Sequence, residues 1–394
     1  MSYLEKLLNG VEVEWKALGQ VLVRTKGTSI TAGQMKILHK DGAPLKIFAG
    51  GKTVAFVDYK DIPDKDINRE PSVIVKSRGI IEFEYYDKPF SHKNEMWSYH
   101  SKNENIDIKF VYHYLRINEP YFQNIGGRMQ MPQISTPDTD KFQIPIPPLS
   151  VQKEIVRILD SFTELTAELT AELTARKKQY NYYREKLLSF EEGDVEWKTL
   201  GWVGEVRMCK RIFKNQTSDS GDIPFFKIGT FGKEPDSYIS RETFDEYREK
   251  YNYPRVGEVL ISASGTIGRS VIFNGEEAYF QDSNIVWLEN DESKVLNKYL
   301  FYFYQVANWN ISDGGVIKRL YNDNIKNTQI PIPYPNNPEK SLAEQARIVS
   351  ILDKFDTLTT SISEGLPKEI ELRKKQYEYY RDMLLSFPKD NLKA

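Results

Sequence analysis

RKKQYNYYREKLLSF, residues 176–190, returns as RKKQYEYYRDMLLSF at 373–387, and this repetition governs how the rest of the chain is interpreted. Further segments return in the same order: VEWKALG at 13–19 as VEWKTLG at 195–201, IPIP at 144–147 and again at 330–333, and IVRILD at 155–160 as IVSILD at 348–353. The shift between the copies grows only from 182 to 197 residues, so the insertions between repeated segments are small. The sequence therefore predicts one scaffold built twice.

The stretches between these anchors correspond more loosely. We align SRGII at 77–81 with SGTIG at 264–268, GGRMQ at 126–130 with GGVIK at 314–318, and PFSHKNEMW, which ends at Trp97, with YFQDSNIVW, which ends at Trp287. Shared anchors with divergent loops are typical of two recognition modules aimed at different targets, because loops on a rigid frame carry specificity. The alternative is an old duplication whose surfaces have drifted.

The chain also begins partway through its own repeat, since YLEKLL at 3–8 resembles YREKLL at 183–188. If the two copies pack around a pseudo-twofold axis, we expect the termini to lie near one another, as chain termini commonly do.

The composition is that of a folded protein with room for two or three domains, at 394 residues and 40% hydrophobic content. No apolar run resembles a signal peptide or a membrane span, so we expect a cytoplasmic protein with no membrane contact. The single cysteine, Cys209, excludes an internal disulfide and a cysteine-based zinc cluster, and we expect it to be a small apolar residue. The net charge of -2 gives no compositional sign of nucleic-acid binding, so any DNA surface must be local.

Each copy contains an amphipathic helix, because its apolar residues recur every three or four positions. In the first copy this apolar stripe consists of Ile155, Leu159, Phe162, Leu165 and Leu169. In the second copy it consists of Ile348, Leu352, Phe355, Leu358 and Ile362. Matching stripes favour a coiled-coil pair over two helices that each lie on their own domain. In the second copy Gly365-Leu366-Pro367 predicts that one helix ends and another begins.

The first copy instead repeats a tetrapeptide, in TELTAELTAELTARKKQY at 163–180. Leu165, Leu169 and Leu173 continue the apolar stripe, and Glu172 stands four residues before Arg176, a favourable helical ion pair. Threonine is a mediocre helix former, and the repeated glutamates repel one another, so the repeat serves length better than local stability. Each unit adds about 6 Å of helix and about 40° of rotation. A neutral duplication in the coding sequence is the alternative.

Together these features resemble the specificity subunit of type I restriction and modification systems, over essentially the whole chain. The resemblance rests on two variable segments that alternate with two helical repeats, on IPIP before each helix, on GTIG and GGVIKRL, and on the YYR-x-x-LL-x-F helix ends. The TAEL repeat is its most specific feature. It resembles a subfamily in which the number of copies sets the gap between the two halves of a split DNA target.

The resemblance implies an α+β fold, with two pseudo-symmetric α/β target-recognition domains separated by two long helices packed as an antiparallel coiled coil. The implied domains are a first recognition domain at 1–148, a central helical spacer at 149–190, a second recognition domain at 191–335 and a C-terminal helical region at 336–394. Each recognition domain would read one half of a bipartite, asymmetric site on double-stranded DNA, mostly through the major groove. The helices would set the gap and bind two methyltransferase subunits, and restriction subunits would join the assembly.

The same resemblance implies a chain that is not an enzyme and holds neither cofactor nor metal. Adenine N6 methylation with S-adenosylmethionine, and ATP- and Mg-dependent translocation with cleavage, would belong to the partner subunits. The residues agree with this. FAGGKT at 48–53 resembles a P-loop, but the position of the first glycine is Lys46, so we interpret it as a turn. The acids of PDTDK at 137–141 lack the pattern of a nuclease site. The four histidines show no metal-binding spacing: His39, His92, His100 and His113.

DNA reading requires cations on phosphates and hydrogen-bonding side chains at base edges. In the first domain the candidates are Lys76, Arg78, Lys93, Asn94 and Arg128. In the second domain they are Ser262, Ser264, Arg269, Ser283, Asn284, Lys318 and Arg319. For each, a solvated surface residue or a loop-stabilising hydrogen bond is the alternative. Because the first domain lacks the second glycine of GTIG, a shared phosphate-binding role for this loop does not follow.

Two other functions fit the sequence: the specificity subunit of a methyltransferase-only system, and a pseudo-symmetric coiled-coil scaffold that reads no DNA. The side chains alone give neither the half-site sequences nor the gap length, since groove contacts depend on docking and DNA shape.

Overall fold

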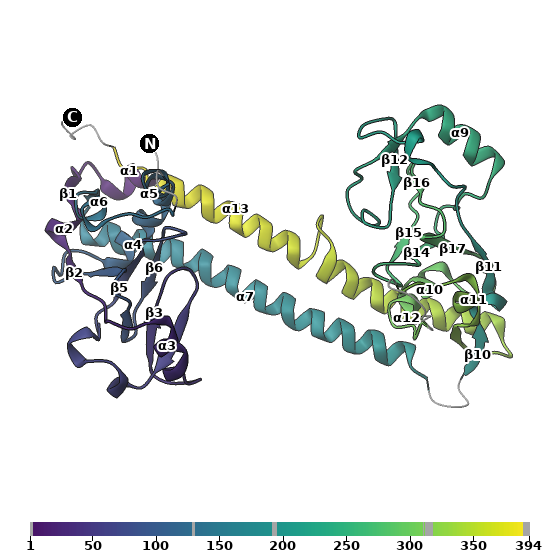
Figure 1. Ribbon diagram of the computed structural model, residues 1–394, viewed down its shortest axis with the longest axis horizontal. Helices are drawn as coiled ribbons and strands as arrows, with labels where there is room; N and C mark the ends of the chain where they lie inside the picture. The colour runs from purple at the N-terminus through teal and green to yellow at the C-terminus, as the bar shows by residue number, and fades with distance from the viewer. Residues whose placement is uncertain (1–2, 128–130, 191–194, 310, 312–317, 389–394) are drawn as a thin grey trace. The chain divides into compact units, whose positions relative to one another are not determined.

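The computed structural model describes residues 3–127, 131–190, 195–309, 311 and 318–388 (Figure 1). The chain divides into two compact units, with Met1–Leu169 and Ile370–Ala394 in unit 1 and Thr170–Glu369 in unit 2. The division falls within two helices, α7 (Leu149–Leu188) and α13 (Leu366–Leu384). Each unit therefore combines one recognition segment with part of each of these helices.

Unit 1 contains an antiparallel four-stranded sheet, a mixed three-stranded sheet and a short ribbon. The four-stranded sheet has the order β2 (Val23–Thr25), β8 (Trp97–His100), β5 (Ser72–Lys76) and β6 (Glu82–Tyr86). The three-stranded sheet has the order β4 (Val54–Val57), β3 (Leu45–Phe48) and β7 (Phe90–His92), and the ribbon pairs β1 (Glu14–Ala17) with β9 (Gln143–Ile146). The helices are α1 (Tyr3–Leu8), α2 (Leu18–Val21), α3 (Ala32–Leu38), α4 (Ile108–Ile117), α5 (Glu119–Gly126) and α6 (Thr136–Asp140).

Unit 2 repeats this plan. Its four-stranded sheet has the order β11 (Gly204–Arg207), β17 (Ile285–Asn290), β14 (Val259–Ser262) and β15 (Ser270–Ile272). Its three-stranded sheet has the order β13 (Tyr238–Ile239), β12 (Ile223–Phe226) and β16 (Tyr279–Phe280), and its ribbon pairs β10 (Val195–Thr199) with β18 (Gln329–Pro333). The helices are α8 (Leu200–Val203), α9 (Arg241–Lys250), α10 (Asn297–Tyr304), α11 (Asn322–Asn327) and α12 (Pro338–Thr360). The duplication seen in the sequence is thus a duplication of architecture.

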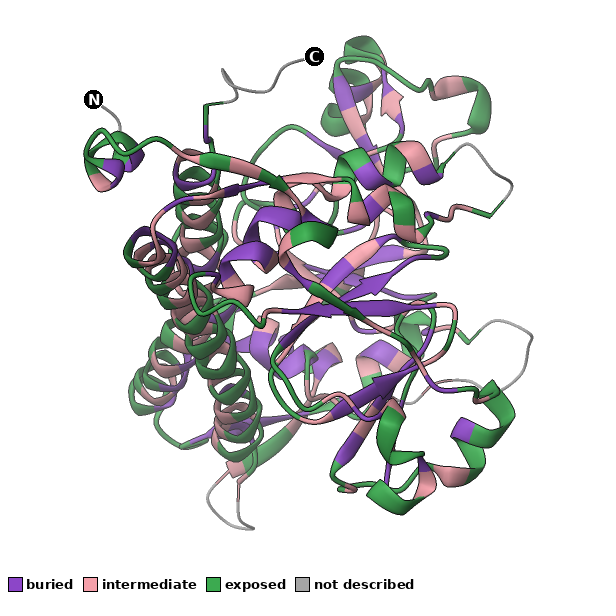
Figure 2. Ribbon diagram, turned by 90° about the vertical axis from the view of Figure 1, so that its left-hand side faces the viewer, coloured by how far each residue is buried: buried purple, intermediate pink, exposed green. Residues whose placement is uncertain are grey.

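Strands supply much of the buried interior (purple in Figure 2). Strands β5, β8 and β14 are buried along their whole length. An equivalent ion pair in each unit joins a helix of the recognition segment to a long helix, α4 to α7 in unit 1 and α10 to α12 in unit 2. Lys109 Nζ lies 2.6 Å from Asp160 Oδ2 in unit 1, and Lys298 Nζ lies 2.6 Å from Asp353 Oδ2 in unit 2. Cys209 is buried among apolar side chains, as predicted, and burial raises the pKa of its thiol to about 12.

The alignment of Trp97 with Trp287 is wrong by one residue. Trp97 packs on the side of its sheet that faces α4, whereas Trp287 packs on the opposite side, in the core around β12 and β16. Val286 occupies the helix-facing position in unit 2. Because side chains alternate between the faces of a strand, a one-residue slip reverses every one of them. The alignment of Ser77 with Ser264 is wrong by the same step, since the carbonyls of Ser77 and Ala263 accept equivalent backbone hydrogen bonds.

α7 is one helix of 40 residues that contains the whole TAEL repeat. Leu165, Leu169 and Leu173 are all half-buried along it, which confirms the predicted apolar stripe. The predicted ion pair also forms, with Arg176 Nε 2.7 Å from Glu172 Oε1.

The two helical segments pack against each other within each unit, as the coiled-coil prediction requires. In unit 1 the rings of Phe162 and Tyr380 stack with centroids 5.2 Å apart, and in unit 2 those of Tyr183 and Phe355 stack at 5.5 Å. Later residues of α7 pair with earlier residues of the second segment, the order of an antiparallel pair.

The second helical segment is interrupted where the sequence predicted. α12 ends at Thr360 and α13 begins at Leu366, and Gly365 between them has a φ of +82°, a left-handed conformation that favours glycine. The placement of Ile362 on the apolar stripe is wrong, because α12 ends two residues earlier and the side chain is 83% exposed.

Both ends of the described chain belong to unit 1, which confirms the prediction for the termini. Leu4 and Leu8 of α1 share an apolar core with Phe387, and Trp15 Nε1 donates a 3.1 Å hydrogen bond to the carbonyl of Pro388.

The FAGGKT segment is the turn of a hairpin, as interpreted from the sequence. β3 ends at Phe48 and β4 begins at Val54, and the amide of Ala49 donates to the carbonyl of Thr53. In the part of the chain that the structure describes, no helix is both long and apolar enough to cross a membrane.

Candidate nucleic-acid interface

Four of the residues predicted to touch DNA lie together in unit 2: Ser264, Ser283, Asn284 and Arg319. Arg319 Nη2 donates to Asn284 Oδ1 at 3.0 Å, to Ser283 Oγ at 3.1 Å and to the Ser283 carbonyl at 3.2 Å. Ser264 Oγ donates to the same Asn284 Oδ1 at 2.8 Å. The contacts connect three separate segments of the chain and fix the orientation of both the guanidinium and the amide.

The backbone explains how these side chains meet. Ser264 and Arg319 face each other across an isolated antiparallel bridge just beyond the end of β14. Ser283 has a φ of +53°, in the left-handed region that ordinary residues rarely adopt. The site is therefore built by the fold and does not depend on one flexible loop.

A pocket of about 390 Å³ adjoins this cluster and is lined by Met208, Ser283, Arg319, Leu320, Tyr321, Asn322 and Asp323. Tyr321 is 57% exposed. Nearby, Arg211 Nε binds Asp282 Oδ2 at 2.9 Å, and Asp282 directly precedes Ser283. Sequence reasoning missed Arg211 and Tyr321, although the basic run KRIFK at 210–214 was a usable signal for the first of them.

Three other candidates of unit 2 are placed differently. Ser262 is buried, and its hydroxyl bonds the carbonyl of Thr266 and the amide of Arg269, so it holds the GTIG turn. Arg269 Nη1 donates to the carbonyl of Phe231 at 3.0 Å. Lys318 is exposed next to Arg319.

Unit 1 has the same bridge with different residues. Arg78 faces Gln133 across it, and both positions lie 186 residues before their counterparts in unit 2. Glu95 lies where unit 2 has Asn284, and Lys93 Nζ binds Glu95 Oε1 at 2.6 Å. Burial raises the pKa of Glu95, but the hydrogen bond and charge of Lys93 and the charge of Arg78 outweigh it and lower that pKa. The carboxylate is thus ionised beside Arg78.

The remaining candidates of unit 1 differ in exposure. Arg78 and Asn94 are exposed, and Arg128 lies outside the described residues. Lys76 is buried at the end of β5, with Nζ 2.6 Å from Glu82 Oε1 and 2.8 Å from Glu84 Oε2. Burial lowers the pKa of Lys76, yet these two hydrogen bonds raise it further, so the ammonium is charged and already paired.

Sequence reasoning did not single out Gln133 or Glu95, which the structure places at this bridge and beside it. For Gln133 a signal was available, because the 186-residue shift between the two IPIP segments, carried back toward the N-terminus, aligns it with Arg319.

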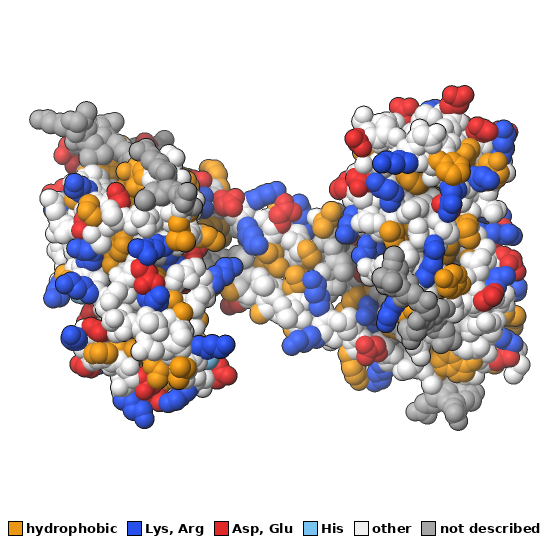
Figure 3. All heavy atoms as spheres, viewed as in Figure 1, with side chains coloured by type: hydrophobic (Ala, Val, Ile, Leu, Met, Phe, Trp, Pro, Cys, Tyr) orange, Lys and Arg blue, Asp and Glu red, His pale blue; other side chains and the backbone are white. Residues whose placement is uncertain are grey.

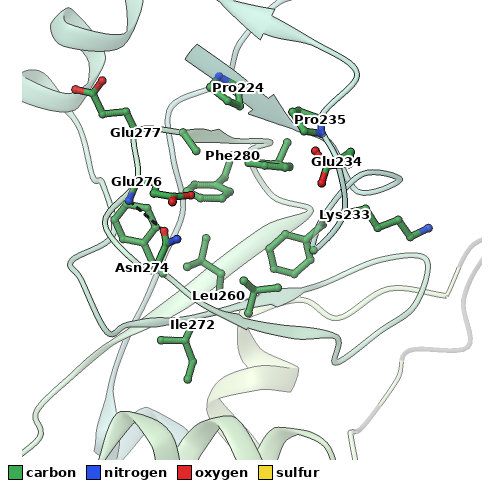
Figure 4. A pocket seen from close by; sticks show the side chains of 16 residues that line it. Pro224, Lys233, Glu234, Pro235, Leu260, Ile272, Asn274, Glu276, Glu277 and Phe280 are labelled. Carbon is green, nitrogen blue, oxygen red and sulfur yellow. Dashed lines mark hydrogen bonds between the residues drawn. The ribbon is translucent and has the colours of Figure 1, made fainter. Parts of the chain in front are cut away.

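A second pocket of unit 2, about 450 Å³ in volume, has the wrong charge for DNA. Figure 4 shows Leu260 and Phe280 facing its interior, with Glu234, Glu276 and Glu277 around it. Carboxylates repel phosphates, so this pocket does not extend the interface. Among the described residues on the face drawn in Figure 3, basic and acidic side chains are interspersed.

The sequence and the fold are both similar to those of known proteins. The family model for the type I restriction modification DNA specificity domain matches residues 21–176 and 192–372. The chain is 48% identical to a putative type I restriction enzyme specificity subunit of Haemophilus influenzae, over 98% of both chains. It is 36% identical to the EcoR124I/EcoR124II specificity subunit of Escherichia coli, over 99% of this chain and 98% of the other. The fold is similar to that of a type I restriction-modification S subunit from M. genitalium, with a TM-score of 0.58 at 16% identity, over 97% and 98% of the two chains.

Proposed function

The chain belongs to the family of type I restriction modification DNA specificity domains, and from this premise we propose that its two units read the two halves of one split DNA site. Its role is DNA recognition as a specificity subunit. Each unit would dock one recognition surface on the duplex and read base edges, mostly in the major groove.

One observation carries the proposal: the two units keep the same backbone bridge while its side chains differ. The Ile134 amide donates to the Ser77 carbonyl at 3.0 Å, and the Leu320 amide donates to the Ala263 carbonyl at 2.8 Å. The residues beside these bonds are Arg78 with Gln133 in one unit and Ser264 with Arg319 in the other. A common frame with different hydrogen-bonding groups would place different readers on similar DNA surfaces. The half-sites would therefore differ, and the whole site would be asymmetric.

The partner chains would supply the chemistry, in the cytoplasm. We assign the helical segments to the docking of two methyltransferase subunits, with restriction subunits joining the same assembly. In this arrangement S-adenosylmethionine, ATP and Mg would be bound by the partners. A solved assembly of a type I restriction-modification system includes a chain with the same fold, at a TM-score of 0.57, which supports the assignment.

The balanced charge of the chain leads to an expectation about its affinity for DNA. With a net charge of -2, the chain alone has little general attraction for DNA, so partner subunits would contribute much of the phosphate contact. We expect weak, strongly salt-dependent binding by the isolated chain and tight binding by the complex with its methyltransferase subunit.

The test is to co-express the chain with that methyltransferase subunit in a host lacking other adenine methylation and to map N6-methyladenine by single-molecule sequencing. The expected result is a gapped motif with two different halves. A continuous motif would contradict two separate readers. Normal assembly with the partner but no methylation, together with no gel shift of any DNA by the complex, would instead indicate a protein scaffold.

A further inference from the structure

We propose that one bridge pair in each unit, Arg78–Gln133 in unit 1 and Ser264–Arg319 in unit 2, distinguishes bases, with its arginine reading a guanine. The inference rests on the proposed function and names the residues that give each half-site its sequence. Both pairs are isolated antiparallel bridges, and both adjoin a glycine with positive φ, Gly79 at +74° and Gly265 at +67°.

The two bridges are the same place in the fold. In each unit the residue before the bridge accepts a backbone hydrogen bond from the opposite segment, Ser77 from Ile134 and Ala263 from Leu320. A third segment lies beside the bridge in both units. Ser77 Oγ donates to the Glu95 carbonyl in unit 1, and the Ala263 amide donates to the Asn284 carbonyl in unit 2. What differs is which member of the bridge carries the arginine.

Arginine is suited to guanine because its N–H donors match the O6 and N7 acceptors in the major groove. The Arg78 side chain is exposed, and no described residue accepts a hydrogen bond from its guanidinium. Glu95, whose carboxylate the charge of Arg78 stabilises, is already bound by Lys93 at 2.6 Å. Arg78 therefore keeps its donors for a ligand.

Arg319 is held in place by hydrogen bonds that use only one of its guanidinium nitrogens. All three of its hydrogen bonds leave from Nη2, toward Ser283 and Asn284. Within the described residues its Nε and Nη1 donate to nothing, so donors are available on an arginine whose position is already fixed. Fixing the side chain before binding reduces the entropy lost on association.

The exchange of the arginine across the bridge has a geometric consequence. Residues opposite each other in an antiparallel pair are about 4.5–5.5 Å apart at Cα. This exceeds the rise of about 3.4 Å per base pair. If both units dock alike, their guanines lie at different positions within the two half-sites. The bridge thus accounts for asymmetry without any change in the scaffold.

The experiment uses the complex with the methyltransferase subunit and compares methylated motifs for the wild type, Arg78→Gln and Arg319→Gln. Losing a base contact of this kind reduces discrimination by about 5- to 150-fold. Arg78→Gln should relax one guanine position in one half-site, and Arg319→Gln one position in the other, with the opposite half unchanged. Arg69→Gln and Arg255→Gln are matched controls, because each removes an exposed arginine that is paired with a carboxylate. Both should leave the motif as it is.

An exchange variant tests the geometry. Arg78→Ser with Gln133→Arg gives unit 1 the arrangement of unit 2, and we expect guanine preference to return at a shifted position. Arg319 is half-buried, so its substitution can disturb folding, which a melting curve of the complex would reveal. If Arg319→Gln lowers the melting temperature, Arg319→Lys and Ser264→Ala test the bridge of unit 2 instead. Each should change base preference only at the guanine position assigned to Arg319.

The outcomes separate the two levels of the proposal. An unchanged motif in the arginine variants, or a uniform loss across all sequences such as a phosphate contact would cause, overturns the assignment of the bridge while leaving the two readers intact. A wild-type complex that methylates no split motif overturns the proposed function itself, and the bridge with it.

Discussion

Deleting one TAEL unit, Thr166–Leu169, should shorten the gap between the two methylated half-sites by about one or two base pairs. Four helical residues contribute about 6 Å of rise and about 400° of rotation, which leaves a net turn of about 40°. One base pair contributes about 3.4 Å and about 35°. The shortening therefore corresponds to nearly two base pairs by length and about one by rotation.

The structure indicates that α7 tolerates this deletion. Removing four residues brings Leu173 into the place of Leu169, so the half-buried stripe begun by Leu165 continues without a gap. The ion pair of Glu172 with Arg176 moves as a unit, because both residues follow the deletion. The break between α12 and α13, at 361–365, offers the second segment a place to adjust.

The assay is methylome mapping of the deletion variant beside three controls. Insertion of one further TAEL unit should lengthen the gap by the same amount. Glu168→Gln keeps the length and should leave the gap unchanged, whereas deletion of Glu168 alone rotates the following stripe by about 100° and should abolish methylation. Both half-sites must keep their sequences. If deletion and insertion leave the gap as it is, the repeat is a neutral expansion and the reasoning fails.

Three further results are expected. Leu8→Ala should lower the free energy of unfolding by about 2–5 kcal/mol in a urea titration, because α1 packs in the core of unit 1, while Ile362→Ala on the exposed break should change it by less than about 0.5 kcal/mol. DNA affinity of the isolated chain, measured by fluorescence anisotropy, should fall steeply with salt; tight binding that is indifferent to salt would count against the proposal. Burial raises the pKa of Asp160, but hydrogen bonds from His113 and Lys109 outweigh it and lower that pKa overall. The stability that Asp160 contributes is therefore present above about pH 4 and is lost as the pH falls through the lowered pKa. Asp160→Asn should flatten the dependence of the free energy of unfolding on pH in that acidic range.

Sequence reasoning succeeded where the physics is local and repeated. A stripe such as Leu165, Leu169 and Leu173 follows from helical periodicity alone, and the interruption at Gly365 follows from backbone conformation. It failed where a strand register was needed. Trp97 and Trp287 are both buried aromatics within strands, and nothing in their identity shows which face of the sheet each occupies. Only the pairing of neighbouring strands settles that.

The arrangement of the candidate residues could be predicted only in part, for a related reason. Residue type singled out Ser264 and Arg319, which the structure places opposite each other, but it gave no means of separating an arginine with available donors from a lysine enclosed by carboxylates. Lys76 illustrates this, because it ends the apolar strand β5, which is buried on both faces, and its residue type did not reveal that Glu82 and Glu84 enclose its ammonium. The 186-residue shift aligns Gln133 with Arg319, but that Gln133 lies opposite Arg78 follows only from the pairing of distant segments in the structure.

The pairing of charges also bears on why so balanced a chain can recognise DNA. Several cations near the two bridges are already neutralised by partners within the protein, among them Lys93 by Glu95 and Arg211 by Asp282. Such pairs hold loops in place but add little net attraction for phosphate. Among the described residues few unpaired donors then remain at each bridge, so under the proposed function sequence discrimination and general affinity would rest on different groups. Such a chain would gain affinity from its partners and contribute chiefly the choice of sequence.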